Sequence, residues 1–270
     1  DQIQPLINLY QQGQLQQALD STHQLLSQFP NSFTLYNIQG AANVGLSQLD
    51  SAIDSYKQAI KIKPDFAETY YNMGIALQDR GDLNAAIDSY QKAVSFEPDY
   101  AEAYSNMGNA LKDKGDLEAA MDSYKQALKI KPDSAEAYNN MGNALNDKGD
   151  LEAAIDSFKQ ALKIKPDYVD AYNNMGKALK DKGDLEAAID SYKQALKIKP
   201  DSQVSLASKL HLQSHICDWA ELEQDRDLIG LLGTKNEPVS PWGLLAFEDS
   251  PRLHRTRSEV FTESLYGNIQ

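Results

Sequence analysis

Residues 101–134 read AEAYSNMGNALKDKGDLEAAMDSYKQALKIKPDS, and the same pattern returns every 34 residues along the chain. Prolines mark this period at Pro30, Pro64, Pro98, Pro132, Pro166 and Pro200. Glycines follow the same spacing at Gly40, Gly74, Gly108, Gly142 and Gly176. A unit of this length cannot bury its own apolar face, so neighbouring units must stack into a solenoid. Because solenoids present long surfaces rather than one catalytic pocket, the period favours a binding scaffold over an enzyme.

Each unit is predicted to contain two antiparallel helices. Tyr104, Met107 and Leu111 follow helical spacing and indicate a first helix of about 13 residues. Gly115 is expected to end this helix, and Asp116 is placed to cap the next one. The apolar stripe of the second helix consists of Leu117, Ala120, Met121, Tyr124, Ala127 and Leu128. Three stretches that contain this second helix begin at residues 115, 149 and 183 and differ at only two positions, which indicates recent duplication or consensus design.

The junction between units is also encoded locally. Pro132 is expected to end the second helix, because it has no N–H and disfavours helical geometry in the residue before it. Asp133, with Glu136 three residues later, predicts a capping box for the following helix. Gly108 and Ala120 are expected to let the two helices of a unit approach closely. One tyrosine per unit is expected in the core rather than in a ligand platform: Tyr36, Tyr70, Tyr104, Tyr138 and Tyr172.

This pattern resembles the tetratricopeptide repeat family. The matching residues of the unit are Tyr104, Met107, Gly108, Ala120, Tyr124, Ala127 and Pro132. The match recurs in five full units: residues 33–66, 67–100, 101–134, 135–168 and 169–202. Residues 1–32 fit only the later part of a unit and are expected to form a partial N-terminal repeat. The resemblance implies an all-α, right-handed α-solenoid of antiparallel helix pairs, with first helices on a concave face that binds proteins or peptides.

Composition narrows the classes of partner. A net charge of −13 and a pI of about 4.7 argue against nucleic acid and anionic membranes as partners. Cys217 is the only cysteine, so no disulfide can form within the chain and a reducing, cytoplasmic compartment is expected. No window reaches the roughly 18 apolar residues that a membrane span needs. The chain runs from Asp1 to Gln270 without an evident start or stop signal, which suggests a fragment, and no motif predicts a cofactor.

One asparagine per unit lies between the core positions of the predicted first helices. This row, the Asn ladder, consists of Asn72, Asn106, Asn140 and Asn174, with Ile38 at the equivalent place in the first full unit. A primary amide both donates and accepts, so it can pair with a peptide backbone without reading side chains. With inner helices about 10 Å apart, each amide would meet roughly every third residue of an extended peptide. The alternative is that these residues only stabilise helices or inter-repeat contacts.

Two further rows complete the predicted peptide-binding face. One row is Tyr71, Ser105, Asn139 and Asn173, and the other is Ile75, Asn109, Asn143 and Lys177. An acidic edge follows at Asp79, Asp113, Asp147 and Asp181. Lys177 and Lys180 add positive charge at the C-terminal end. Co-chaperone members of the family hold a C-terminal carboxylate in a basic clamp, and this face lacks the density of Lys and Arg which that mode requires.

The 34-residue period ends after Ser202. Residues 203–216 are predicted to form a capping helix, because the last unit would otherwise expose its stacking face. Its predicted apolar positions are Val204, Leu206, Leu210 and Leu212. His211, His215 and Cys217 raise the question of a metal site, but only Asp218 lies near as a fourth ligand. A structural or surface role is preferred, and no metal is predicted.

A second resemblance begins in the same region. Residues 214–232 (SHICDWAELEQDRDLIGLL), 237–251 (EPVSPWGLLAFEDSP) and 253–261 (LHRTRSEVF) are similar to the segment that joins repeats to catalytic domain in O-linked N-acetylglucosamine transferase-like proteins. The matching residues are Cys217, Asp218, Trp219, Pro238, Pro241, Leu244, Leu245, Asp249, Ser250 and Pro251. The resemblance implies that residues 203–270 form a capping helix and helical extension at the start of a following domain. The chain shows no βα alternation or phosphate-binding Gly loop, so no catalytic residue is predicted.

These observations leave three functional hypotheses. The first is a non-enzymatic scaffold whose groove binds extended peptide segments of partner proteins. The second is the substrate-docking arm of a bacterial O-linked N-acetylglucosamine transferase-like enzyme, separated here from its catalytic domains. The third is self-association through the repeat ends or the convex face.

Overall fold

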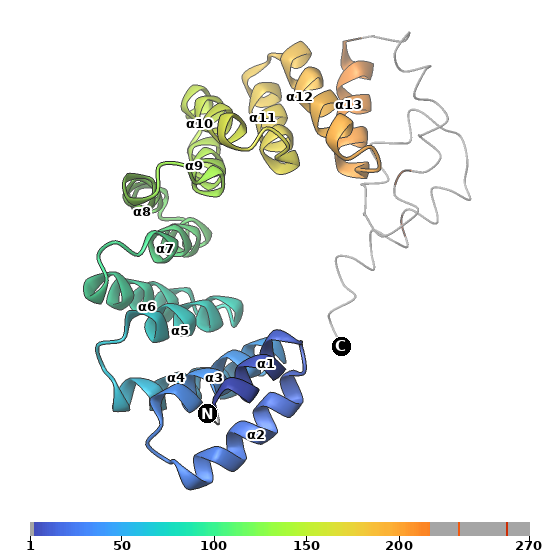
Figure 1. The fold of residues 1–270 in the computed structure, drawn as a ribbon. Helices are drawn as coiled ribbons and strands as arrows, with labels where there is room; N and C mark the ends of the chain where they lie inside the picture. The colour runs from blue at the N-terminus through green and yellow to red at the C-terminus, as the bar shows by residue number, and fades with distance from the viewer. Residues whose placement is uncertain (1–2, 217–231, 233–257, 259–270) are drawn as a thin grey trace. The chain divides into compact units, whose positions relative to one another are not determined.

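The computed structural model describes residues 3–216, 232 and 258. Residues 3–216 form thirteen α-helices in sequence (Figure 1): α1 (Ile3–Gln11), α2 (Leu15–Gln28), α3 (Phe33–Gly45), α4 (Leu49–Ile62), α5 (Ala67–Asp79), α6 (Leu83–Phe96), α7 (Ala101–Lys114), α8 (Leu117–Ile130), α9 (Ala135–Lys148), α10 (Leu151–Ile164), α11 (Val169–Lys182), α12 (Leu185–Ile198) and α13 (Gln203–His215). None of the helices described is both long and apolar enough to cross a bilayer.

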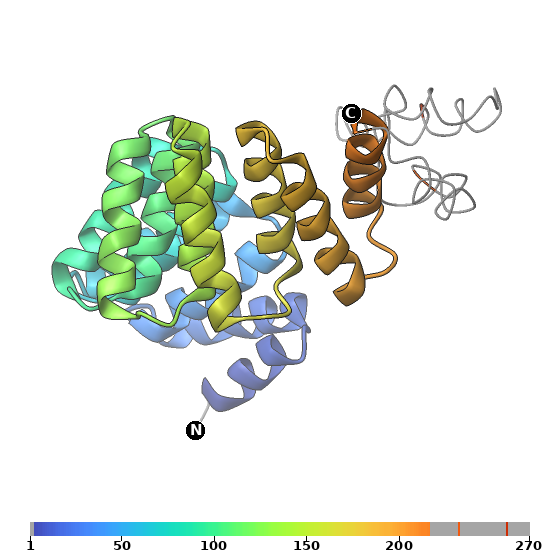
Figure 2. The ribbon, with the colours of Figure 1, turned by 90° about the horizontal axis from the view of Figure 1, so that it is seen from above.

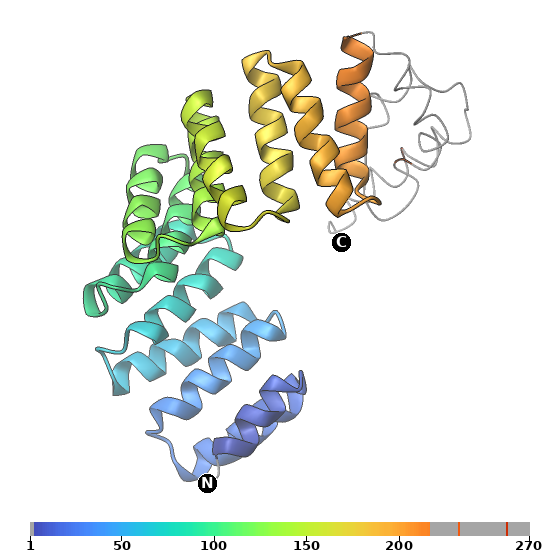
Figure 3. The ribbon, with the colours of Figure 1, turned by 45° about the horizontal axis from the view of Figure 1, so that its top comes forward.

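The chain divides into two compact units, residues 1–133 with α1–α8 and residues 134–270 with α9–α13. Within each unit the helices form antiparallel pairs, as the first unit shows in Figure 3 and the second in Figure 2. Within a unit, the second helix of each pair also packs on the helix that follows it: α2 on α3, α4 on α5, α6 on α7, α10 on α11 and α12 on α13. First helices of neighbouring pairs touch as well: α1 with α3, α3 with α5, α5 with α7, and α9 with α11. The predicted all-α solenoid is confirmed.

The turn between the two helices of a pair follows the predicted signals. Gly115 ends α7 in the left-handed region, with φ of 89°, where a side chain would be strained. The carboxylate of Asp116 then accepts a hydrogen bond of 3.2 Å from the backbone N–H of Ala119. Equivalent caps begin α6, α10 and α12 at Asp82, Asp150 and Asp184, whereas Gln14 and Gln48 before α2 and α4 provide no side-chain cap.

The predicted capping box at Asp133 is wrong. The cap of α9 is Ser134, whose hydroxyl accepts a hydrogen bond of 3.2 Å from the backbone N–H of Ala137. The turn after Pro132 extends one residue further than expected, so Asp133 lies outside the helix and α9 begins only at Ala135. At the corresponding position before α3 and α13, Ser32 and Ser202 also cap the helix, whereas Phe66, Tyr100 and Tyr168 provide no side-chain cap.

The two helices of a pair meet where a glycine faces a buried aromatic ring. A Cβ built on Gly108 would lie 2.6 Å from Cε1 of Tyr124, so only glycine leaves room for this ring. The same contact joins Gly40 to Tyr56, Gly74 to Tyr90, Gly142 to Phe158 and Gly176 to Tyr192. These rings are 5% exposed or less. The tyrosines of the first helices, which were expected in the core, are only half-buried, because the second helices supply the core aromatics.

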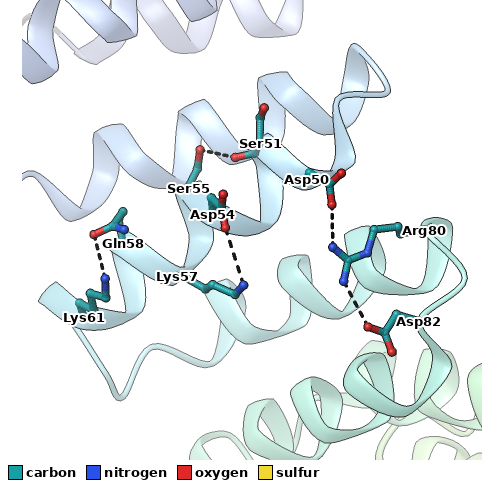
Figure 4. A network of polar contacts seen from close by, with 9 residues as sticks. All are labelled: Asp50, Ser51, Asp54, Ser55, Lys57, Gln58, Lys61, Arg80 and Asp82. Atoms are coloured by element: carbon teal, nitrogen blue, oxygen red, sulfur yellow. Dashed lines mark hydrogen bonds and ion pairs between the residues drawn. The ribbon is translucent and has the colours of Figure 1, made fainter.

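Ion pairs tie the end of a first helix to the preceding pair. The guanidinium of Arg80 lies 2.7 Å from the carboxylate of Asp50 and 3.2 Å from that of Asp82 (Figure 4). In the second unit, Lys182 and Glu152 make the equivalent pair at 3.3 Å. These groups are largely exposed to solvent, so each pair contributes little to stability.

The capping helix forms as predicted and packs on α12. Leu206, Leu210 and Leu212 are buried, and Leu232 packs against the first two. The prediction fails at Val204, which is 50% exposed because it lies in the first turn of α13 beside the exposed Asp201.

Two glycines of α3 provide a matched test of the glycine–ring contact. In Gly40→Ala the new Cβ would lie 2.5 Å from the ring of Tyr56, whereas in Gly45→Ala it meets the flexible end of Leu15 at 2.6 Å. Both changes gain helix propensity, about 1 kcal/mol each. We expect Gly40→Ala to lower the free energy of unfolding by about 1–3 kcal/mol relative to Gly45→Ala, measured by urea denaturation. Equal stabilities of the two variants would show that the ring can move aside.

Candidate functional site

The Asn ladder lies on the first helices of four consecutive repeats. Asn72 on α5 and Asn106 on α7 belong to the first unit, and Asn140 on α9 and Asn174 on α11 belong to the second. All four side chains are half-buried. Because first helices of neighbouring pairs touch within each unit, these amides are close enough to the adjacent repeat to bond with it.

Two ladder residues make hydrogen bonds between repeats. Asn106 donates from Nδ2 to the hydroxyl oxygen of Tyr71 at 3.0 Å. Asn174 donates from Nδ2 to Oδ1 of Asn139, also at 3.0 Å. In each bond the acceptor belongs to the flanking row of the preceding repeat. The structure therefore joins the Asn ladder to the first flanking row, which the sequence analysis treated as separate rows. In both bonds the two residues are 35 positions apart in the sequence, and this recurrent separation could have predicted them.

The flanking row also links repeats where the ladder does not. Asn37 accepts a hydrogen bond of 2.7 Å from the hydroxyl of Thr69, and Asn173 accepts one of 2.7 Å from Ser205. Alanine replaces this hydroxyl residue at positions 103, 137 and 171, and at positions 103 and 171 the ladder amide of the same helix makes the link. One side-chain hydrogen bond thus joins α3 to α5, α5 to α7, α9 to α11 and α11 to α13.

Asn139 is the most enclosed of the predicted peptide-binding residues, at 5% exposure. Its Oδ1 accepts from Asn174, and its Nδ2 donates to Oδ1 of Asn140 at 3.4 Å. The side chain therefore positions two ladder amides within the second unit.

A hydrogen bond from a core tyrosine to the second flanking row is present in one repeat and absent from the next. The hydroxyl of Tyr124 donates to Oδ1 of Asn109 at 2.7 Å. One repeat later Phe158 takes the place of this tyrosine, so Asn143 receives no such donor. In the same repeat Oδ1 of Asn146 is buried with no hydrogen-bond partner among the described residues. The Phe158 repeat therefore has a buried amide oxygen that accepts no hydrogen bond from the described residues, and a core ring without a hydroxyl that could donate one.

The C-terminal lysines of the predicted face are exposed on α11. Nζ of Lys180 lies 3.4 Å from the carboxylate of Asp181, which offsets its charge. The same arrangement occurs in α7, where Lys112 and Asp113 are 3.0 Å apart. These pairs place acidic and basic groups side by side at the end of the face.

His211 and His215 lie together on α13, with ring centroids 4.4 Å apart. Nδ1 of His215 is 2.9 Å from the carbonyl oxygen of His211. Burial lowers the pKa of His211 because it desolvates the charged imidazolium, and His215 and then Lys180 lower it further by charge repulsion. In the described part of the chain no group of three His, Cys, Asp or Glu side chains is placed to hold a metal, and Cys217 and Asp218 lie outside that part.

Sequence models of the TPR repeat match residues 40–81, 76–115, 108–145 and 142–183. Two tetratricopeptide repeat models match residues 7–32 and 169–202. The chain belongs to the tetratricopeptide repeat (TPR) family. No curated protein matches the chain. The residues that carry the resemblance to the transferase junction, from Cys217 to Pro251, lie outside the described residues.

Several solved structures resemble this chain. MamA is 30% identical, with a TM-score of 0.57 over 60% of this chain and 94% of MamA. YrrB, described as a TPR protein with an unusual peptide-binding site, is 21% identical, with a TM-score of 0.57 over 70% of this chain and 97% of its own. PilW, a type IV pilus biogenesis factor, is 23% identical, with a TM-score of 0.69 over 76% and 95% respectively. The likeness to YrrB and PilW concerns the fold.

Acidification should loosen the capping helix of this TPR chain. The folded pKa of His211 lies below its ordinary value of 6.5, so the unfolded chain binds the proton first as pH falls. Stability is therefore fully present above about pH 6.5 and is lost as pH falls through the folded pKa. We expect α13 to lose amide-exchange protection between pH 7 and 5, and His211→Gln to flatten this dependence. An unchanged pH profile in His211→Gln would assign the effect to another group.

A hydroxyl added to the Phe158 ring should stabilise the second unit. In Phe158→Tyr the new O–H meets Asn143, the counterpart of the Asn109 acceptor, or Asn146, the counterpart of Gln78, which accepts from Tyr90 at 3.0 Å. The expected gain is about 0.5–1.5 kcal/mol in the free energy of unfolding.

Tyr124→Phe is the matched control and should lose a similar amount. Urea denaturation measures both variants. A Phe158→Tyr variant that is no more stable than the parent chain would mean that neither amide oxygen accepts the new donor.

Proposed function

We propose that this TPR chain is a non-enzymatic interaction scaffold that binds extended peptide segments of partner proteins along its first helices. The Asn ladder pairs with the peptide backbone, and Tyr71, Asn109, Asn139, Asn143, Asn173, Lys177 and Lys180 shape the surrounding face. The observation that carries this proposal is the fixed orientation of the ladder amides of Asn106 and Asn174. YrrB, a structural neighbour described as having a peptide-binding site, supports this use of the fold.

Fixing an amide before binding reduces the entropy lost when a ligand arrives. A primary amide has two N–H donors and a carbonyl oxygen, and the inter-repeat bond uses one donor. Among the described residues, that bond is the one polar contact of each of these two side chains. The second N–H and the carbonyl oxygen can then pair with the C=O and N–H of one peptide residue.

The magnitude of these contacts limits what the Asn ladder achieves alone. Each amide contact contributes about 0.5–1.5 kcal/mol, so four give about 2–6 kcal/mol. After the entropy of ordering a peptide is subtracted, this corresponds to millimolar affinity or weaker. Useful affinity therefore requires side-chain subsites next to the ladder, or more than one bound segment.

We propose that the partners are cytoplasmic proteins and that the chain binds no nucleic acid, membrane or cofactor. Self-association of the chain is a further proposal, and light scattering tests it. The alternative function, a substrate-docking arm of an O-linked N-acetylglucosamine transferase-like enzyme, is favoured by the sequence motif at Cys217, Asp218 and Trp219. Both functions use the face of the first helices in the same way. Two α/β domains encoded downstream in the parent gene would favour the transferase arm.

Ligand contact and inter-repeat bonding are separable within the Asn ladder. Asn72 and Asn140 donate no inter-repeat bond among the described residues, unlike Asn106 and Asn174. We expect Asn72→Ala with Asn140→Ala to lose most captured proteins in a lysate pull-down read by mass spectrometry, at an unchanged Tm. Asn106→Ala with Asn174→Ala should lose capture and also about 1 kcal/mol of stability for each bond.

The control is Asn84→Ala, which removes an exposed amide from α6, a second helix, and should keep both capture and Tm. If the Asn72 and Asn140 double variant captures the same proteins as the parent chain, the Asn ladder does not carry recognition.

A further inference from the structure

Three aromatic rings occupy equivalent positions just before a first helix: Phe66, Tyr100 and Tyr168. A lysine three residues earlier in the chain covers two of them. Nζ of Lys63 lies 4.4 Å from the centroid of Phe66 and 5.4 Å from that of Phe33. Nζ of Lys165 lies 4.8 Å from the centroid of Tyr168. These distances are typical of a cation–π contact, so the repeat itself shows that a ring at this position attracts an ammonium group.

The third ring lacks this lysine. The residue three positions before Tyr100 is Glu97, an exposed acid. The ring of Tyr100 instead packs on that of Tyr71, with centroids 4.8 Å apart and planes tilted by 40°. Both rings are half-buried and so keep some surface exposed to solvent. At Phe66 the lysine three residues earlier covers the ring, but at Tyr100 that position holds Glu97.

The charges around the Tyr71–Tyr100 pair are also unbalanced. One repeat later, Lys131 and Glu102 form an ion pair of 3.3 Å. The residues at these two positions in the Tyr100 repeat are Glu97 and Glu68, so two carboxylates stand where the next repeat has opposite charges. Burial, then Tyr71, then Glu68, Glu97 and Glu102 raise the pKa of Tyr100, which agrees with negative charge close to the ring.

We propose that Tyr71, Tyr100, Glu68 and Glu97 form a subsite for the lysine or arginine side chain of a bound peptide. The two rings offer a cation–π surface. The carboxylates of Glu68 and Glu97 have no lysine at position 97 to pair with, so they can pair with the cation of the peptide. Tyr71 also holds Asn106 through its hydroxyl, so a peptide backbone on the Asn ladder passes beside the rings. The inference rests on the proposed peptide binding and gives it specificity: the ladder accepts any backbone, and the subsite selects a cation.

The subsite can be tested with amino-acid probes that do not depend on peptide capture. The intact chain, with ¹³C-labelled tyrosine and phenylalanine rings, is titrated with N-acetyl-lysine methylamide and followed by NMR. N-acetyl-norleucine methylamide has a similar stem without the charge. We expect the lysine probe to shift the ring signals of Tyr71 and Tyr100, with the norleucine probe about tenfold weaker.

Two matched variants exchange the residues that precede the ring in two different repeats. Glu97→Lys restores the repeat's own lysine and should weaken the lysine probe about tenfold, because the new ammonium covers the ring. Lys63→Glu gives Phe66 the same acidic neighbour and should create a response at the Phe33 and Phe66 signals.

Equal responses to the two probes, or unchanged lysine binding in Glu97→Lys, would overturn the proposal. The Asn72→Ala, Asn140→Ala double variant should bind the lysine probe as the parent chain does. Loss of peptide capture in that variant with the probe response intact separates the Asn ladder from the subsite, so either can fail alone.

Discussion

The contact between a glycine and a buried aromatic ring is the constraint on which each repeat depends. A Cβ on Gly74 would lie 2.6 Å from the ring of Tyr90, so the two helices can be this close only while the position stays glycine. The same close approach recurs in the five full repeats, where a Cβ at the glycine would lie 2.5–2.8 Å from the enclosed ring. Within each unit, residues 34 apart therefore take the same place on successive first helices, and a row in the sequence becomes a row on a surface.

Hydrogen bonds between repeats then determine what such a row can do. The bonds from Asn106 to Tyr71 and from Asn174 to Asn139 hold the amides in one orientation. The sequence left stability and recognition as alternatives for these side chains, and in the proposed peptide binding the same amides would serve both. Where Thr69 or Ser205 makes the link, the flanking asparagine bonds to a hydroxyl instead.

Departures from the repeat give individual junctions their chemistry. The repeat with Phe158 in place of tyrosine also has the oxygen of Asn146 buried without a partner among the described residues. Glu97 in place of lysine leaves the Tyr71–Tyr100 pair beside carboxylates. A solenoid tolerates such changes because each repeat contacts only its neighbours, so a local change in charge or polarity does not disturb the rest of the stack.

The sequence alone determined the features that depend on neighbouring residues. The period, the helix break at Gly115, the cap at Asp116 and the end of the second helix before Pro132 all follow from backbone conformation and nearby hydrogen bonds. Local reasoning failed at Asp133 and Val204, where the exact register of a turn decides which residue caps or packs. Only the tertiary structure showed that Tyr71 meets Asn106 and Tyr100, because these contacts join different helices and exist only once glycine and ring have set the distance between them.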